Sequence, residues 1–284
     1  MEEQKGAKEA ESLLEDLGFD HLPINVNQFI NAISDESFPV SIEFFAFESD
    51  QFLGKAVGNE NGAGIIINSN IPDSRRLNFT AAHEIGHVCM HIMQGSSQNF
   101  ACGNSEMGDY FKDPLERQAN GFASGLLMPR RLVKPLTDGE VNWHNIKQIS
   151  DFCNTSLEAV FRRLAWLEKA PVAMVIHQNK QFKRFVPTAH FDFYIQKTIL
   201  STDQLVSCVD VNYQAYPNEY DVVDPIDWVV PKRNGILLTE LYASSILLKD
   251  GFIYTLLSYD DDCLEEVEDL DNLEMEHSQH FGRK

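Results

Sequence analysis

The sequence predicts an α+β protein built in three parts. Its 284 residues exceed a typical single domain of roughly 100–200 residues. Helical stripes of apolar residues alternate with short strand-like runs in the first half of the chain, whereas strand-like runs dominate its last third. We therefore expect a first domain over residues 1–138, a helix-turn-helix-like segment over 139–170, and a mixed α+β domain over 171–284.

The first domain is expected to open with two amphipathic helices and a small sheet. One helical stripe stops at Gly18, a residue suited to the left-handed conformation that often ends helices, and consists of Ala10, Leu13, Leu14 and Leu17. A shorter helix begins near Asn25. Alternating or apolar runs punctuated by glycines predict strands over residues 40–44, 52–57 and 64–68.

Two longer helices are expected after this sheet. The first covers residues 75–93, and its core-facing stripe consists of Ala81, Ile85, Val88 and Ile92. The second starts at Asp113, an N-cap residue followed by the proline that favours the first helical position, and ends before Pro129. We expect these two helices to pack together.

The pattern changes in the second half of the chain. Helices over residues 146–152 and 157–167 form the helix-turn-helix candidate, with Thr155 and Glu158 as an expected capping box. Strands are expected over 172–176, 182–186, 235–238 and 252–257, around a helix-compatible stretch at 241–248. Residues 260–276 contain ten acidic side chains and no basic one, which is typical of a solvated tail.

The composition limits the partners of the protein. Its 23 basic and 43 acidic residues give a net charge of -20, which disfavours contact with phosphate backbones, so direct DNA binding is not expected. No run approaches the ~20 apolar residues of a membrane span, and the polar start of the chain lacks the pattern of a signal peptide. Five scattered cysteines predict reduced thiols. We therefore expect a cytoplasmic protein without membrane contact.

An H-E-x-x-H segment, His83 to His87, carries the strongest chemical signal in the sequence. Residues at i and i+4 share one face of a helix, so both imidazoles can bind one metal ion. Glu84 lies beside them, where it would act as a general base that activates water for attack on a carbonyl. Histidine and carboxylate ligands suit Zn²⁺ or Mn²⁺, and the order of affinities favours zinc.

A catalytic zinc takes three protein ligands, and several residues compete to be the third. Glu116 is favoured because it lies on the next long helix, although with Asp113 as N-cap it also fits the N3 position of a capping box. His91 would lie about 12 Å along the helix axis from His83, too far to share an ion, and more readily orients a neighbour. Cys102 ranks last, because a lone cysteine more often behaves as an inert small hydrophobe.

Two separated segments resemble the ImmA/IrrE family of metallopeptidases. One runs from Arg75 to His87 and the other from Glu116 to Pro129. The resemblance covers roughly residues 1–130 and implies a zincin-like fold for the first domain, with Glu116 as the third metal ligand. The three-part layout is similar to that of IrrE-type members, whose last domain is GAF-like.

This resemblance implies a cytoplasmic protease that cleaves a helix-turn-helix repressor and so switches on stress-response or mobile-element genes. Edge strands of zincins pair with extended substrates, which makes substrate-binding candidates of Ile65, Ile66 and Ile67, although an ordinary core strand is the alternative. The candidates for stabilising the oxyanion are Tyr110, His91 and His144.

Two alternatives compete with the protease interpretation. A DNA- or protein-binding transcriptional regulator with a vestigial or structural metal site would use residues 145–169, but their net charge of about +1 falls short of a basic recognition surface. A small-molecule effector of the C-terminal domain would gate the protease, but that half of the chain carries no pocket signature.

Overall fold

The computed structural model describes residues 2–49, 51–95, 100–103, 113–137, 139–205, 207–231 and 236–266, with the backbone alone at 101–103. These residues combine helices and sheets, which confirms the predicted α+β class. The chain forms two compact units, which are Met1–Gly139 with Asn145–Arg163 and Glu140–His144 with Leu164–Lys284. Within the described ranges, no helix combines the length and the apolar character needed to cross a bilayer.

A four-stranded sheet forms one layer of the first unit, in the order β1-β3-β2-β4. Its strands are β1 (Val40–Phe45), β2 (Phe52–Asn59), β3 (Gly62–Asn68) and β4 (Phe100–Gly103). β1 pairs in parallel with β3, and β2 pairs antiparallel with both β3 and β4. The sequence predicts the first three strands, whereas β4 is too short for its periodicity to reveal it.

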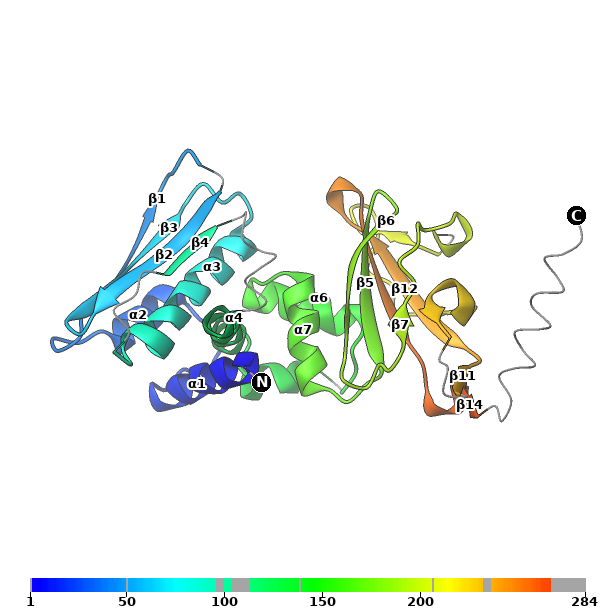
Figure 1. Ribbon diagram of the computed structural model, residues 1–284, viewed down its shortest axis with the longest axis horizontal. Coiled ribbons are helices and arrows are strands. Elements are labelled where there is room, and N and C mark those ends of the chain that lie inside the picture. Colours follow the sequence, from blue (N-terminus) through cyan, green and yellow to red (C-terminus); the bar gives the residue numbers. More distant parts are fainter. Residues whose placement is uncertain are drawn as a thin grey trace, which may run out of the picture. The chain divides into compact units, whose positions relative to one another are not determined.

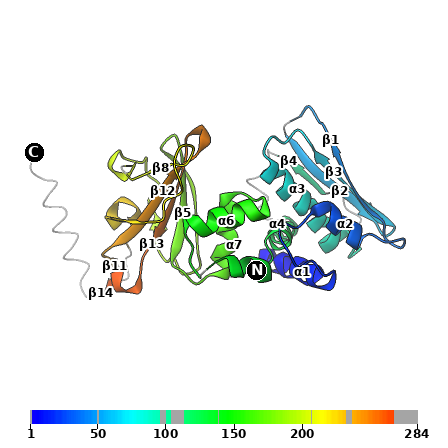
Figure 2. The ribbon, with the colours of Figure 1, turned by 180° about the vertical axis from the view of Figure 1, so that it is seen from behind.

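Helices stack on one face of this sheet. α3 (Ser74–His87) lies against the strands, α4 (Pro114–Leu127) packs on α3, and α1 (Glu2–Asp16) packs on α4 (Figure 1). α2 (Val26–Ile33) contacts β1 and α3, and Figure 2 shows this arrangement from behind. The fully buried side chains of this core include Phe29, Ile65, Ile85 and Phe122.

Two glycines allow α1 and α4 to approach closely. A Cβ atom added at Gly121 would lie 1.9 Å from the carbonyl oxygen of Glu3, and one added at Gly125 would lie 2.4 Å from that of Ala7. In the sequence these glycines look unfavourable, since each costs about 1 kcal/mol relative to alanine inside a helix. The close packing of the two helices explains why they occur there.

The helix-turn-helix-like segment contains α6 (Trp143–Cys153) and α7 (Leu157–Leu167), after the short helix α5 (Arg130–Val133). Its residues 145–163 belong to the first unit. There Arg163 is buried, and its guanidinium donates to the Met128 carbonyl oxygen at 2.9 Å and to the carboxylate of Glu11 on α1. Arg163 thus links α7 to α1 and to the segment that follows α4.

The expected capping box at the start of α7 is wrong. The hydroxyl of Ser156, and not that of Thr155, accepts the helix N–H of Ala159 at 3.1 Å. Thr155 is fully buried, and Glu158 pairs with Arg162 at 3.0 Å. Two adjacent hydroxyl residues both satisfy the sequence rule, and burial decides which of them remains free to cap the helix.

A six-stranded sheet dominates the second unit, along the path β6-β5-β13-β12-β8 with β9 also paired to β12. Its strands are β5 (Val172–Gln178), β6 (Gln181–Pro187), β8 (Val209–Asp210), β9 (Asp221–Val223), β12 (Leu241–Leu247) and β13 (Phe252–Ser258). Two smaller ladders join β7 (Tyr194–Ile195) to β10 (Val229–Val230) and β11 (Ile236–Leu238) to β14 (Leu264–Glu266). β14 falls within the predicted acidic tail, which lies outside the described residues from 267 onward.

The helix that we consider from the sequence for residues 241–248 is wrong, because this segment forms strand β12. It lies inside the sheet, with β13 on one side and β8 and β9 on the other. A strand buried on both faces gives an almost continuous apolar run, which periodicity alone does not distinguish from a buried helix. Its buried Ser245 is satisfied by a hydrogen bond of 2.8 Å to the Thr255 hydroxyl on β13.

Replacing Gly121 by alanine should lower the free energy of unfolding of the first unit by about 3 kcal/mol, because the new methyl group meets backbone atoms of α1. Helix propensity alone predicts a gain of about 1 kcal/mol, so even the sign of the change is informative. Urea unfolding followed by circular dichroism measures it. Gly64→Ala is the control, since a Cβ atom there meets nothing nearer than the Ser41 hydroxyl at 3.8 Å. An unchanged stability of Gly121→Ala would contradict the close packing of α1 on α4.

Candidate metal centre

Helix α3 carries the H-E-x-x-H segment into the interior of the first unit. Asp73 caps the helix by accepting the N–H of Arg75 at 2.9 Å. His83, Glu84 and His87 are 4%, 0% and 1% exposed. The sequence predicts that this helix packs through its apolar face and that the opposite face, which carries the histidines, is more open. The helix is instead buried on both sides, because the sheet covers one side and α4 covers the other.

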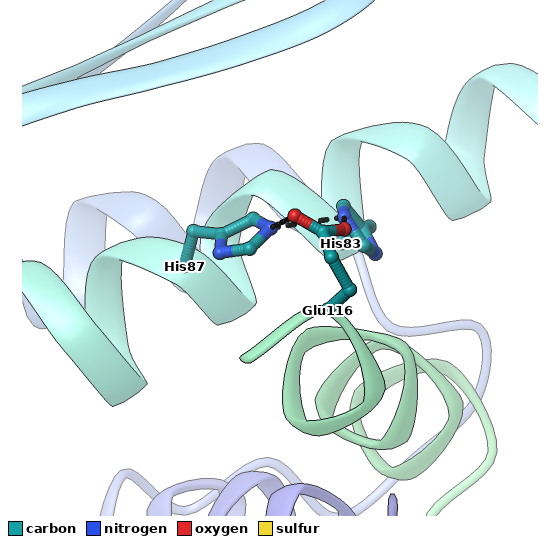
Figure 3. Close-up of side chains that lie close together, drawn as sticks. All are labelled: His83, His87 and Glu116. Atoms are coloured by element: carbon teal, nitrogen blue, oxygen red, sulfur yellow. Dashed lines mark hydrogen bonds and ion pairs between the residues drawn. The ribbon is translucent and has the colours of Figure 1, made fainter. Parts of the chain in front are cut away.

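The close approach of α4 to α3 brings a carboxylate to the histidines. A Cβ atom added at Gly86 would lie 3.1 Å from the Cα atom of Ala119, so the glycine of the motif allows the two helices to touch. Glu116 lies on α4 about one turn before Ala119 and faces α3 (Figure 3). The motif thus supplies both the imidazoles and the space for their partner.

Three groups suited to metal binding converge between these helices (Figure 3). The Nε2 atoms of His83 and His87 lie 3.0 Å apart. The two carboxylate oxygens of Glu116 lie 3.2 Å from the Nε2 atom of His83 and 3.3 Å from that of His87. Among the residues that the structure describes, this trio is the one cluster of at least three such groups close enough to share an ion.

The spacings within this trio are close to those of a tetrahedral metal site. Zinc lies about 2.0–2.2 Å from nitrogen and oxygen ligands, so two ligands at the corners of a tetrahedron lie about 3.3–3.6 Å apart. The two imidazole nitrogens in the protein lie 3.0 Å apart, and each lies 3.2 or 3.3 Å from a different oxygen of Glu116. Three protein ligands would leave the fourth corner open, which is the arrangement of catalytic rather than structural zinc sites.

Each histidine of the trio has a polar partner behind it. The Nδ1 atom of His83 lies 2.9 Å from the Oδ1 atom of Asn120, one turn after Glu116 on α4. The Nδ1 atom of His87 lies 3.1 Å from the Nδ1 atom of His91, which belongs to a π-helical turn, Val88–Ile92. Such partners fix the orientation of a ligand ring and leave its other nitrogen for the metal.

Glu84 lies beside the trio with both oxygens of its carboxylate buried and without a hydrogen bond of normal geometry in the described part of the chain. The backbone of Ala56 on β2 still favours the charged carboxylate. Burial disfavours the charged carboxylate and raises the pKa of Glu84 to about 7. A buried carboxyl group that titrates near neutrality is well suited to proton transfer.

Burial and mutual hydrogen bonds set the charges of the metal-free trio. At His83 burial opposes the charged form, but the hydrogen bond to Glu116 and the two nearby glutamates outweigh it and raise the pKa. Burial lowers the pKa of His87 to about 4. Burial would raise the pKa of Glu116, but its hydrogen bonds to both histidines lower it to about 2. The trio therefore favours an ionised Glu116 beside a protonated His83.

The structure separates the two predicted roles at the start of α4. Asp113 accepts the N–H of Leu115 at 2.8 Å and so caps the helix. The carboxylate of Glu116 is directed at the two imidazoles, the position that a third ligand would occupy.

The other predicted residues lie in different settings. β3, which contains Ile65, Ile66 and Ile67, is an interior strand hydrogen-bonded to β1 and β2, so its expected role as an edge for substrate is wrong. His144 is exposed and belongs to the second unit. Tyr110 and the side chain of Cys102 lie outside the described residues. An oxyanion role for Tyr110, His91 or His144 stays a prediction.

Several contacts around the site escape sequence reasoning. Asn120 lies one turn after Glu116 in the second family-like segment, but the sequence does not reveal its contact with His83. Phe100 stacks on the His87 ring with centroids 4.3 Å apart, and Gln118 lies 3.1 Å from His91. Both contacts depend on tertiary packing, for which the sequence carries no local signal.

Comparison with known protein families matches residues 38–165 to a peptidase family model described as the IrrE N-terminal-like domain. Among solved structures, a transcriptional regulator of Mycobacterium tuberculosis is similar, with a TM-score of 0.51 and 12% identity over 89% of this chain and 76% of that chain. At this identity the likeness concerns the fold alone. No curated protein matches the sequence at a significant level.

The matched segment contains Glu84 and the whole trio. It also begins before the first strand of the sheet and ends within α7, so it includes the helices that position the site. The predicted resemblance to the ImmA/IrrE family is confirmed for this part of the chain, since residues 38–165 match the model of the IrrE N-terminal-like domain.

Proposed function

We propose that this protein is a zinc-dependent endopeptidase in which His83, His87 and Glu116 hold the metal and Glu84 acts as the general base. The observation that carries the proposal is the convergence of two imidazole nitrogens and a carboxylate at near-tetrahedral spacings, beside a buried glutamate. The match to a peptidase family model supports it. Zinc is preferred to manganese because it binds nitrogen ligands more tightly.

Glu84 performs the proton transfers of the proposed reaction. A zinc ion at the trio would supply Lewis-acid polarisation of the scissile carbonyl and of the attacking water. Glu84 takes one proton from that water as the water oxygen bonds to the carbonyl carbon. It gives the proton to the amide nitrogen as the C–N bond breaks. In the metal-free protein burial raises the pKa of Glu84 to about 7, and a cation at the trio would lower it and so favour the base form at neutral pH.

The proposed substrate is a protein, and by family resemblance a cytoplasmic helix-turn-helix repressor whose cleavage switches on stress-response or mobile-element genes. The similar solved structure is that of a transcriptional regulator, which agrees with a role in gene control. The proposed point of substrate entry is β4 and not β3, because β4 is an edge strand and its Phe100 stacks on His87. An extended peptide could add to this edge through main-chain hydrogen bonds.

The regulator alternative finds less support in the helix-turn-helix-like segment. A recognition helix presents free basic side chains to DNA. In this segment three of the four basic side chains are engaged with carboxylates: Lys147 with Asp151, Arg162 with Glu158, and Arg163 with Glu11. The GAF-like character of the second unit, and a small-molecule effector bound there, stay predictions.

Replacing Glu116 by alanine should abolish stoichiometric zinc binding, because two imidazoles alone do not complete a three-ligand site. Asp113→Ala is the matched control on the same helical turn: it should lose about 1 kcal/mol of stability with the N-cap but retain the metal. Elemental analysis after zinc reconstitution measures both. Full zinc occupancy in Glu116→Ala would overturn its role as third ligand.

Replacing Glu84 by glutamine should leave zinc binding intact and reduce cleavage of a co-expressed candidate repressor by about 10²–10⁴-fold, because the general base is lost. Glu60→Gln makes the same chemical change at an exposed position and should cleave normally. Immunoblots of the repressor, calibrated against enzyme dilutions, give the rates. Undiminished function of Glu84→Gln would favour the regulator alternative.

Zinc binding should release protons and weaken as the pH falls. The raised pKa of His83 means that this residue carries a proton above its ordinary titration range, and the metal must displace that proton. The loss of affinity should therefore begin at a higher pH than for a free histidine. Calorimetric titrations in two buffers of different ionisation enthalpy count the protons released. A count near zero at pH 6.5 would contradict this charge state.

A further inference from the structure

A chain of polar side chains continues from His87 away from the metal trio. The Nδ1 atom of His87 lies 3.1 Å from the Nδ1 atom of His91, and the Nε2 atom of His91 lies 3.1 Å from the Oε1 atom of Gln118 on α4. The side-chain amide of Gln118 donates to the carboxylate of Glu2 on α1. Three helices thus each contribute to one line of hydrogen bonds that ends at a ligand-type histidine.

The carboxylate of Glu2 at the far end fixes which atoms of this line donate hydrogen bonds and which accept them. An ionised carboxylate only accepts hydrogen bonds, so Glu2 takes the amide N–H of Gln118 and the amide oxygen of Gln118 is left to accept. His91 must then donate from Nε2, which leaves the Nδ1 atom of a neutral His91 as an acceptor. With a metal at the trio, the Nε2 atom of His87 gives its lone pair to the metal instead of facing Glu116 with an N–H, and His87 donates from Nδ1 to His91.

The line is shielded from water over most of its length. His91 and Gln118 are 4% and 8% exposed. The ring of Phe100 lies over both histidines, with centroids 4.3 Å from His87 and 5.2 Å from His91. Inside such a site water cannot replace a missing partner, so a broken link leaves a buried polar group unsatisfied.

We propose that His91, Gln118 and Glu2 are positioning residues that hold His87 in the tautomer with a free Nε2 atom, and that α1 thereby contributes to the affinity of the metal centre. The proposal rests on the proposed function in so far as it concerns a metal. It deepens that function, because it assigns a role to a helix that supplies none of the three ligands and lies before the segment matched by the family model.

The two histidines of the trio differ in how they are held. His83 is oriented by Asn120 from α4, which also carries Glu116, so that contact involves only the two helices of the site. His87 depends on a longer path that crosses to α1 through Gln118. The glycine contacts near Gly121 bring α1 close enough for Glu2 to reach that path.

The tautomers of the zinc-loaded protein test the direction of the line without any variant. In long-range ¹⁵N–¹H spectra of the full chain, His91 should be protonated at Nε2 and not at Nδ1, and His87 should be protonated at Nδ1. Assignment uses the loss of one imidazole signal in His91→Gln. A wild-type His91 protonated at Nδ1 and not at Nε2 would overturn the proposal.

Variants of the line test its effect on the metal. His91→Phe keeps a ring but removes the acceptor, and should weaken zinc binding about 10–100-fold, the range typical of lost outer partners. His91→Gln restores an acceptor and should bind zinc more tightly than His91→Phe. Competition with a chromophoric chelator gives the dissociation constants. Equal affinities for wild type and His91→Phe would overturn the proposed contribution to binding.

A matched pair on α1 tests the remote end of the line. Glu2→Gln introduces a group that donates as well as accepts, so the direction is no longer fixed, and zinc should bind up to about 10-fold more weakly. Glu3→Gln makes the same change one residue later, where the carboxylate faces Arg117 at 3.9 Å, and should match wild type. Equal zinc affinity in Glu2→Gln and wild type would remove α1 from the proposal.

Failure of the proposed function would look different. A wild-type protein that binds no zinc after reconstitution would defeat the metal centre itself. A protein that binds zinc with His91 in the opposite tautomer, or with equal affinity in wild type and His91→Phe, would keep the metal centre and overturn the line of positioning residues.

Discussion

The burial of a polar cluster between two helices is the constraint on which the first unit depends. His83, His87 and Glu116 each interact favourably with water, and an unpaired charge buried away from water costs several kcal/mol. The three groups satisfy one another only while α3 and α4 stay in contact, which Gly86 permits by offering no side chain to Ala119. The distance between α3 and α4 therefore sets the distances within the trio.

The contact between α3 and α4 in turn depends on the elements that pack on their outer sides. α4 is held on its far side by α1, where Gly121 and Gly125 allow backbone contact. α3 is held on its other side by the sheet, which keeps Glu84 out of water. Residues with no chemistry of their own thus decide whether the chemical groups meet. Many of them are small, because the lack of a large side chain lets the helices pack closely.

Much of the fold could be predicted from the sequence, because several element ends are set by local chemistry. Gly18 adopts a positive φ of 75° after α1, and Asn25 and Asp113 cap α2 and α4 as their side chains suggest. β12 could not be predicted, since burial on both faces erases the alternation that identifies a strand. The interior position of β3 depends on strand order, which only tertiary packing determines.

Some residues of the site can be predicted from local sequence patterns, whereas others depend on tertiary packing. The histidine pair and Glu84 follow from a spacing of four residues on one helix, and Glu116 from a second segment that resembles a known family. The partners Asn120, Gln118 and Phe100 depend on how α4 and β4 pack against α3, and periodicity within one element does not report on its neighbours.

The π-helical turn after the motif has a consequence for the chain's tolerance of length changes. Each residue of a helix turns the following side chains by about 100°, so deleting one residue between Val88 and Met90 would swing His91 to another face of the helix. Val88 and Cys89 are buried, so a substitution there must keep the packing, whereas a change in their number would also misplace His91. The segment beyond the motif is thus constrained in its length as well as in its composition.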